Sequence, residues 1–382
     1  IDRKSARNKQ KGKIDMQGFV ARKALEAISP YVAGKPIEET AREYGLDPAR
    51  IVKLASNENP LGMSPKAKNA AMQALVNGTR YPDGAAQVVR EAAAVFAGVS
   101  PDEVIVGNGS DEILGLIART VLAPGDRCVY SQYSFSVYEL SAQECAAQCV
   151  EGPAKDFHVD LDGLLAATDV NTRLIYITNP NNPTGLPLEP AALFHFLERV
   201  PEKCVVVLDE AYTDFMDEKL RTDSFAWVKK FPNLLVTRTF SKAYGLAGLR
   251  AGFGVANKEL IEMMNRIRPP FNMNSAAQAA AVAALEDQAF LKTVVDSNTK
   301  ERARLAAFFN ELGLDQLPSQ ANFIMVRVGP KAAEINEAML RRGVILRPLK
   351  SYGLPEYMRI SVGSREENDI FTKAFREALS VK

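Results

Sequence analysis

The chain of 382 residues contains few of the residues on which several classes of protein depend. Its four cysteines include no CxxC pair and are too few for a disulfide framework. Cys145 and Cys149, four residues apart, are expected to share one face of a helix and to serve in packing. With only two histidines, His158 and His195, the chain offers poor support for a histidine-rich metal site or a Ser-His-Asp hydrolase. We therefore predict no bound metal.

Excess charge and long apolar runs are missing too. Lysine and arginine number 47 and aspartate and glutamate 46, so the formal net charge is +1 and no basic surplus predicts a nucleic acid or an acidic membrane as partner. No apolar run reaches the roughly 18 residues that a membrane-spanning helix requires. The basic N-terminal segment lacks the apolar core of a secretory signal. We expect a disordered tail over residues 1–15 and a cytoplasmic protein.

What is present is an ordinary globular composition, 47% hydrophobic and 24% charged, in a chain long enough for two or three domains. From residue 101 to about 256, apolar strands alternate with helices, which favours a mostly parallel sheet covered on both faces. A long helix then leads into a smaller α+β unit. We predict an N-terminal segment (16–60) that joins the small domain, a large domain (61–285) and a small C-terminal domain (286–382).

Two charged residues stand at the ends of predicted buried strands. Lys242, in TFSKAYGLAGLR, has apolar and aromatic neighbours, although lysines prefer solvated positions. Desolvation lowers the pKa of an amine and frees it to attack a carbonyl. Asp209 ends the strand CVVVLDEAY, where a carboxylate is costly to bury without a cationic partner. An ordinary loop lysine and a turn-capping aspartate are the alternatives.

Two polar turns follow other strands of the same region. GNGSDE (107–112) opens a helix, and its small residues and helix N-terminus suit a phosphate, although Ser110 or Asp111 could serve only as a helix cap. NPNNPTG (179–185) is a rigid loop that can present an amide, or a plain turn. Ligands of such sheets bind beyond the carboxyl ends of the strands. The four features together indicate a phosphorylated cofactor.

These motifs, with SNENPLG, RYPDG, QYSFSVY and MRISVGSREEN, resemble the histidinol-phosphate aminotransferase family, and the resemblance extends over residues 28–380. The family consists of class-II-like, fold-type I aminotransferases that use pyridoxal 5'-phosphate (PLP). The resemblance implies an α/β protein, with a large, mostly parallel, seven-stranded α/β/α domain and a smaller α+β domain. It also implies a homodimer.

The resemblance implies a role for each cofactor residue. Lys242 would bind PLP as a Schiff base and shuttle the substrate proton, and Asp209 would pair with the pyridine nitrogen. Asn182 and Tyr212 would bond the ring oxygen, and Phe135 would stack on the ring. Lys242, Asp209 and Tyr212 are the predicted catalytic residues. The predicted phosphate ligands are Gly109, Ser110, Asp111, Thr239, Ser241 and Arg250.

The resemblance also implies the substrate residues. Arg359 would grip the α-carboxylate, for which a bidentate fork is suited. Arg347 would bind a distal phosphate, Asn57 would line the entrance and Tyr31 would cover the site. A surface ion pair for Arg347 and simple packing for Tyr31 are the alternatives. Tyr81 would reach the cofactor of a second subunit.

The resemblance implies a reaction of histidine biosynthesis. In it, an amino group passes reversibly from L-histidinol phosphate to 2-oxoglutarate, giving imidazole acetol phosphate and L-glutamate. Three alternatives stay open at this point: an aromatic amino acid aminotransferase, a PLP decarboxylase of a phosphorylated amino acid, and a binding protein without activity that keeps the scaffold.

Overall fold

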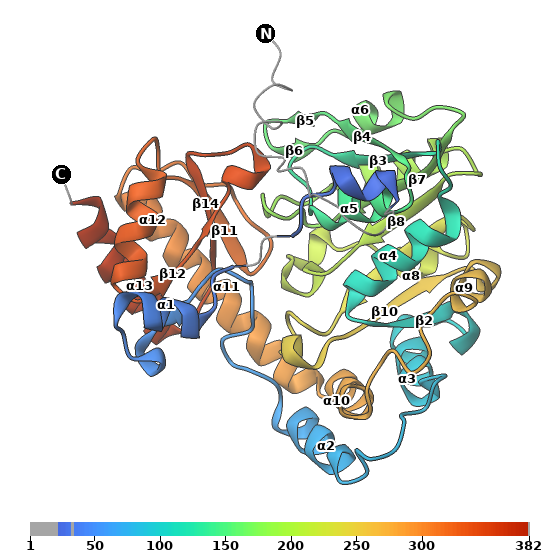
Figure 1. The fold of residues 1–382 in the computed structure, drawn as a ribbon, viewed down its shortest axis with the longest axis horizontal. Coiled ribbons are helices and arrows are strands. Elements are labelled where there is room, and N and C mark those ends of the chain that lie inside the picture. Colours follow the sequence, from blue (N-terminus) through green and yellow to red (C-terminus); the bar gives the residue numbers. More distant parts are fainter. Residues whose placement is uncertain (1–21, 32–33, 381–382) are drawn as a thin grey trace, which may run out of the picture.

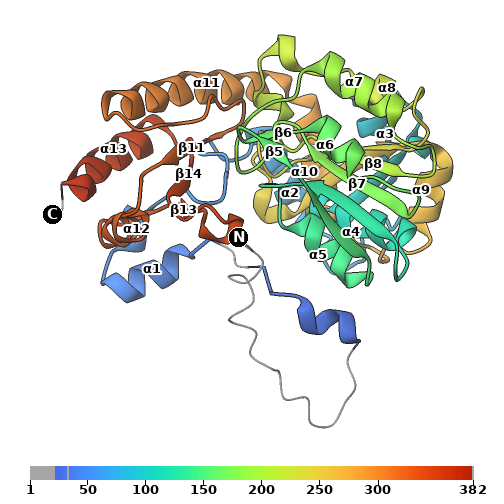
Figure 2. The same cartoon turned by 90° about the horizontal axis from the view of Figure 1, so that it is seen from above.

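The computed structural model describes residues 22–31 and 34–380, and the statements below concern these residues. The expected tail over residues 1–15 lies outside them. The chain forms a large part, in green, yellow and cyan, and a smaller part in orange and red (Figures 1 and 2). The long helix α11 (Gln288–Glu311) leads from the large part into the small one.

A seven-stranded sheet forms the centre of the large part. In sheet order the strands are β2 (Val104–Asn108), β10 (Ala251–Ala256), β9 (Leu234–Thr239), β8 (Val205–Asp209), β7 (Thr172–Thr178), β3 (Arg127–Ser131) and β4 (Gln148–Gly152). Strand β10 runs antiparallel to both of its neighbours, and the other pairs are parallel. The sheet is therefore mostly parallel, as predicted.

Helices cover both faces of this sheet. Successive side chains of β7 point to opposite faces and belong to two different buried clusters. Leu174 and Tyr176 belong to one buried cluster, whereas Ile175 and Ile177 belong to another. The first cluster packs under α4 (Ser110–Val121), α5 (Val137–Glu144) and α9 (Lys258–Asn265). The second packs under α2 (Pro65–Leu75), α3 (Gln87–Ala97), α6 (Leu161–Ala166), α7 (Pro190–Arg199), α8 (Ser224–Trp227) and α10 (Ser275–Glu286). The predicted α/β/α fold class is confirmed.

The small part is built on an antiparallel sheet in the order β11 (Phe323–Arg327), β14 (Tyr357–Ser361) and β13 (Arg347–Pro348). Its helices are α11, α12 (Ala332–Arg341) and α13 (Arg365–Leu379), whose apolar side chains pack on the sheet in one core. An early strand, β1 (Val52–Lys53), pairs with β12 (Val344–Ile345), and α1 (Ile37–Tyr44) contacts α12.

The N-terminal segment is therefore divided between the two parts. Residues 37–54 pack on the small part, whereas the 3-10 helix η2 (Lys23–Ala27) contacts α5 of the large part. The domain limits at residues 60 and 285 stay a prediction. The remaining short elements are η3 (Pro48–Arg50), η4 (Pro101–Glu103), η5 (Thr213–Phe215), η6 (Glu218–Leu220), η7 (Ala247–Leu249), η8 (Lys350–Tyr352), β5 (Ala154–Lys155) and β6 (His158–Val159).

One local expectation is wrong. Cys145 and Cys149 do not share a helix, because α5 ends at Glu144 and Cys149 lies in β4. Ala146 between them adopts the left-handed conformation (φ 56°), which turns the chain out of the helix and into the strand. Within residues 22–31 and 34–380, no helix combines the length and the hydropathy that a membrane span requires.

Candidate active site

Lys242 lies in the loop between β9 and β10, with its amine turned toward the N-terminal segment. The amine donates a hydrogen bond to the backbone oxygen of Ser56 at 3.1 Å. Burial lowers the pKa of Lys242 to about 8, and the positive charges of Arg359 and Arg250 act in the same direction. A substantial fraction of this amine is therefore neutral near pH 8 and able to act as a nucleophile.

Asp209 is the last residue of β8 and is 3% exposed. One carboxylate oxygen accepts from the Tyr138 hydroxyl at 2.8 Å, and the other accepts from the Thr237 hydroxyl at 3.1 Å. Burial raises the pKa of Asp209 to about 6, although both hydroxyls favour the charged form. Because these two donors are neutral, a cationic nitrogen in the adjoining space is a fitting further partner for the carboxylate.

Tyr138 and Thr237 are site residues to which the resemblance assigns no role. Tyr138 is fully buried on α5, and its ring stacks on that of Tyr176 with centroids 4.5 Å apart. Thr237 pairs in register with Asp209 across β8 and β9. Only the order of the strands identifies Thr237 as a neighbour of Asp209. Tyr138 ends the QYSFSVY motif, but nothing in that motif indicates a contact with Asp209.

A narrow cradle lies where α4 begins against β10. A Cβ atom on Gly252 would come within 2.3 Å of the Ser110 nitrogen, and one on Gly109 would come within 2.6 Å of the Arg250 guanidinium. Arg250 also donates to the Ser241 hydroxyl at 3.4 Å. A cation, a hydroxyl and the first amides of a 12-residue helix thus converge, which suits a phosphate.

Two further predicted phosphate ligands border the cradle. Thr239 is buried at the end of β9, where its hydroxyl accepts from the backbone N–H of Ser241 at 3.1 Å. Asp111 is exposed in the first turn of α4. Its carboxylate cannot donate a hydrogen bond when charged, so its backbone N–H is the group that suits an anion.

Arg359 joins the small part of the chain to the large one. Its guanidinium donates to Asn182 Oδ1 at 2.6 Å and to the backbone oxygen of Ala55 at 2.8 Å. Arg359 is 7% exposed, and its buried Nε has no hydrogen-bond partner among the described residues. A buried donor without a partner is costly, so Arg359 is suited to an anionic ligand.

Asn57 and Tyr212 are in contact, and the charge of Arg359 acts on Tyr212. The Asn57 amide donates to the Tyr212 hydroxyl at 3.1 Å, and both residues are buried. The Lys242 amine is 5.8 Å from the centre of the Tyr212 ring. The structure buries Asn57, which is predicted to line the substrate entrance, to 1% exposure between Tyr212 and Ser361.

The outer rim of the site is more open. Tyr31 is 51% exposed, and its ring meets Phe135 edge-on with centroids 6.4 Å apart. The Arg347 guanidinium lies 5.9 Å from the Tyr31 ring. Arg347 also pairs in register with Arg359 across β13 and β14, so the two arginine side chains project from the same face of the small sheet.

Tyr81 has a different setting. Its side chain is 82% exposed, and its ring stacks on Phe271 with centroids 4.6 Å apart. The structure therefore brings together the predicted residues of the cofactor pocket and the rim, while Tyr81 faces outward on the large part of the chain.

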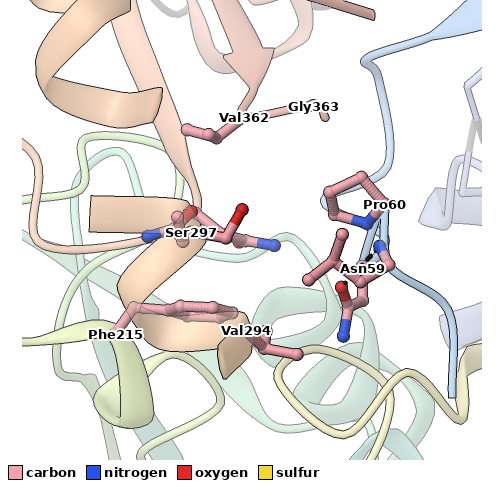
Figure 3. Close-up of a pocket in the computed structure, with 10 residues that line it drawn as sticks. Asn59, Pro60, Phe215, Val294, Ser297, Val362 and Gly363 are labelled. Carbon is pink, nitrogen blue, oxygen red and sulfur yellow. Dashed lines mark hydrogen bonds between the residues drawn. The ribbon is translucent and has the colours of Figure 1, made fainter. Parts of the chain in front are cut away.

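A small pocket adjoins the site, between the N-terminal segment, α11 and the loop after β14 (Figure 3). Asn59 on one wall donates to the backbone oxygen of Ala243 at 3.0 Å, beside Lys242. Asn322 on another wall donates to the backbone oxygen of Asn57 at 3.0 Å. Within the described residues, no group of three or more His, Cys, Asp or Glu side chains is arranged to hold a metal ion.

The comparisons with known proteins agree with this geometry. The family described as aminotransferase class I and II matches residues 49–375. Histidinol-phosphate aminotransferase 1 of Cupriavidus pinatubonensis is 51% identical over 358 residues, covering 93% of this chain and 95% of the relative. Histidinol-phosphate aminotransferase 2 of Ralstonia nicotianae is 52% identical over 360 residues, covering 93% and 96%.

A solved structure extends the likeness to three dimensions. The histidinol-phosphate aminotransferase of Sinorhizobium meliloti, in complex with pyridoxal-5'-phosphate, has a TM-score of 0.86 and 29% identity, covering 95% of this chain and 98% of that one. Fold and site thus define an aminotransferase of class I and II. Within that class, the chain belongs to the family of the histidinol-phosphate aminotransferases, and the predicted resemblance is confirmed.

Proposed function

We propose that this protein is a PLP-dependent transaminase of histidine biosynthesis. It exchanges the amino group between L-histidinol phosphate and 2-oxoglutarate, giving imidazole acetol phosphate and L-glutamate. The observation that carries the proposal is that the buried Lys242 amine interacts electrostatically with both the Arg359 guanidinium and the buried Asp209 carboxylate. Relatives that are about half identical over most of their length carry the same assignment in their names.

The donors present fit PLP group by group. The Asp209 carboxylate fits a protonated pyridine nitrogen, and the cradle of Gly109, Ser110 and Arg250 fits the phosphate. Asn182 and Tyr212 carry polar groups suited to the ring oxygen, and Phe135 offers an aromatic face. The remaining proposed phosphate ligands are Asp111, Thr239 and Ser241. When bound, the cofactor supplies the electron sink that a carbanion at the substrate Cα requires.

The protein's own residues supply attachment, proton transfer and orientation. Lys242 holds the cofactor through its amine and then moves the proton at the substrate Cα, a role that requires its pKa near the working pH. Arg359 binds the α-carboxylate of glutamate through its fork. Arg347, which projects from the same face of the sheet, binds the phosphate of histidinol phosphate, and Tyr31 covers it.

An aromatic amino acid is the second candidate substrate, because the rings of Tyr31 and Phe135 border the same space. Measuring kcat/KM for L-histidinol phosphate and for L-phenylalanine separates the two. The proposal predicts a preference for the phosphorylated substrate. A preference for phenylalanine of about tenfold or more, equivalent to about 1.4 kcal/mol, contradicts it.

A homodimer completes the proposal. Exposed apolar side chains gather on and near α2 and α3, where monomeric proteins rarely keep large apolar patches. They include Met72, Leu75, Val76, Tyr81, Val88 and Val95. Tyr81 would extend from this surface to the cofactor phosphate of the second subunit. Sedimentation as a monomer at micromolar concentration would contradict the proposed homodimer. A cytoplasmic location, the ordinary setting for such a biosynthetic step, belongs to the same proposal.

A further inference from the structure

Asn57 is held in an unusual conformation by groups of the small part. Its φ of 55° lies in the left-handed region, which asparagine tolerates better than most residues. Its backbone N–H donates to the Ser361 hydroxyl at 2.8 Å, and its backbone oxygen accepts from Asn322 at 3.0 Å. Both bonds lie within the buried interior. Hydrogen bonds to both the backbone N–H and the backbone oxygen thus fix the position of Asn57.

Ser361 also fixes the direction of the Asn57 amide. The serine hydroxyl has a single proton, and its oxygen already accepts from the Asn57 backbone N–H. The proton therefore goes to the second neighbour, Asn57 Oδ1, at 2.8 Å. With its oxygen turned toward Ser361, the amide presents its NH₂ group to the Tyr212 hydroxyl at 3.1 Å.

The amide direction decides where the Tyr212 proton goes. A phenol that accepts from an amide NH₂ keeps its own proton available for another acceptor. Were the amide reversed, its oxygen would take that proton, and Tyr212 could no longer donate elsewhere. The Tyr212 ring is itself held in place by Phe323, which it meets edge-on with centroids 5.1 Å apart.

We propose that Ser361 is a positioning residue that acts through Asn57. It orients the amide so that the Tyr212 hydroxyl donates its proton to the ring oxygen of the cofactor. This inference rests on the proposed function, because it needs PLP bound at Lys242. It assigns Asn57 a task beyond lining the substrate entrance, and it links three separate segments of the chain, the loop before α2, the turn after β8 and the end of β14.

The small sheet places this device beside the substrate arginine. Ser361 and Arg359 lie two residues apart on β14, so both side chains project from the same face toward the site. Arg359 donates to the backbone oxygen of Ala55, two residues before Asn57. The end of β14 thus supplies both Arg359, which binds the substrate carboxylate, and Ser361, which sets the direction of the Tyr212 hydrogen bond.

The test is a pH titration of the visible absorbance of the lysine-bound cofactor in four holoenzymes: wild type, Ser361→Ala, Tyr212→Phe and the double variant. A donor to the ring oxygen withdraws the electron density that holds the proton between that oxygen and the lysine nitrogen. Loss of the donor therefore raises the pKa of the absorbance change. We expect Ser361→Ala to raise it by about one unit, the equivalent of one hydrogen bond to a charged group.

The double variant distinguishes orientation from other effects of the serine. If Ser361 acts through Tyr212, Ser361→Ala adds nothing to the shift that Tyr212→Phe produces, so the cycle is fully non-additive. Ser319→Ala is the matched control, because it removes another buried serine hydroxyl, one that accepts from the Ala321 N–H at 3.0 Å. This control is expected to titrate like the wild type.

Two results overturn the inference: an unchanged pKa in Ser361→Ala while Tyr212→Phe shifts, or shifts that add fully in the double variant. Should Ser361→Ala not fold, Ser361→Cys keeps the volume and weakens the hydrogen bond, and its pKa is expected to rise by a smaller amount. An unshifted pKa in folded Ser361→Cys would also overturn the inference. A wild-type protein without any lysine-bound absorbance contradicts the proposed function instead.

Discussion

The inner and outer halves of the candidate site are built differently. The inner half, around Asp209 and Lys242, consists of side chains at the ends of neighbouring buried strands, and Asp209 is 3% exposed. The outer half, around Tyr31 and Arg347, comes from distant segments, and Tyr31 is 51% exposed. The difference teaches that the chemistry depends on the rigid sheet, whereas the choice of substrate depends on residues at an open rim.

This comparison separates the effects of substitutions. A change in the inner half should affect every substrate alike, because all substrates meet the same cofactor. A change at the rim should affect one substrate more than another.

Replacing Asp209 by asparagine should have the largest effect. Turnover with either substrate is expected to fall by about 10²- to 10³-fold, because a protonated ring nitrogen loses its buried partner. The same change should stabilise the cofactor-free protein. Burial raises the pKa of Asp209 to about 6, so above that pH the folded chain holds a carboxylate whose charge opposes folding.

Chemical denaturation checks the second half of that prediction. The free energy of unfolding of the cofactor-free Asp209→Asn protein should exceed that of the wild type by about 3 kcal/mol at neutral pH. The gain should disappear as the pH falls toward the usual pKa of an aspartate. Asp162→Asn, at an exposed ion pair, is the control. Equal turnover in Asp209→Asn and the wild type would contradict a role for Asp209 at the cofactor.

Arg359→Lys should lower kcat/KM for L-glutamate by about 100-fold, and should lower that for L-histidinol phosphate less, because L-histidinol phosphate has no α-carboxylate. Lysine keeps the charge but loses the planar fork that reaches Asn182, Ala55 and an incoming anion at once. Steady-state kinetics measure the effect, and Arg341→Lys, at an exposed surface ion pair, is the control. An equal loss for both donors would contradict the assignment of Arg359 to the α-carboxylate of glutamate.

Arg347→Ala should separate the two substrates. We expect kcat/KM for L-histidinol phosphate to fall by about 10- to 100-fold, through lost charge-assisted hydrogen bonds, while the value for glutamate changes far less. Lys350→Ala removes a nearby exposed cation and serves as the control. Equal losses for both substrates would show that the rim does not carry the specificity.

The pH dependence of cofactor uptake should follow Lys242. Its pKa is lowered to about 8, so the amine is mostly protonated below that pH and mostly neutral above it. Only the neutral amine attacks a carbonyl, so the rate at which the cofactor-free protein binds PLP covalently should rise about tenfold from pH 7 to pH 9. Stopped-flow absorbance measures this rate. A rise of about 100-fold over this range, which an amine with the ordinary lysine pKa would give, would contradict a perturbed Lys242.

The sequence predicts the inner half better than the rim, for physical reasons. Uninterrupted apolar strands can only be buried between helices, and polar residues at their ends must then gather at one edge of the sheet. Asp209 and Lys242 could be found in this way. The contact of Tyr138 with Asp209 could not, because Tyr138 ends the QYSFSVY motif and that motif does not show what its last residue contacts.

Contacts between distant segments also could not be predicted from the sequence. The pairing of Arg347 with Arg359 depends on the register of two short strands, and the contact of Ser361 with Asn57 joins residues 304 positions apart. The misplaced Cys145 and Cys149 have a local cause, since four-residue spacing implies one face only while the helix continues.

Borohydride reduction of the holoprotein, followed by mass mapping of the modified lysine, shows whether Lys242 holds the cofactor. A reduced cofactor adduct is expected on Lys242, and it should be lost in Lys242→Ala. An adduct on a different lysine of the wild type, or an adduct that persists at wild-type level in Lys242→Ala, would contradict it.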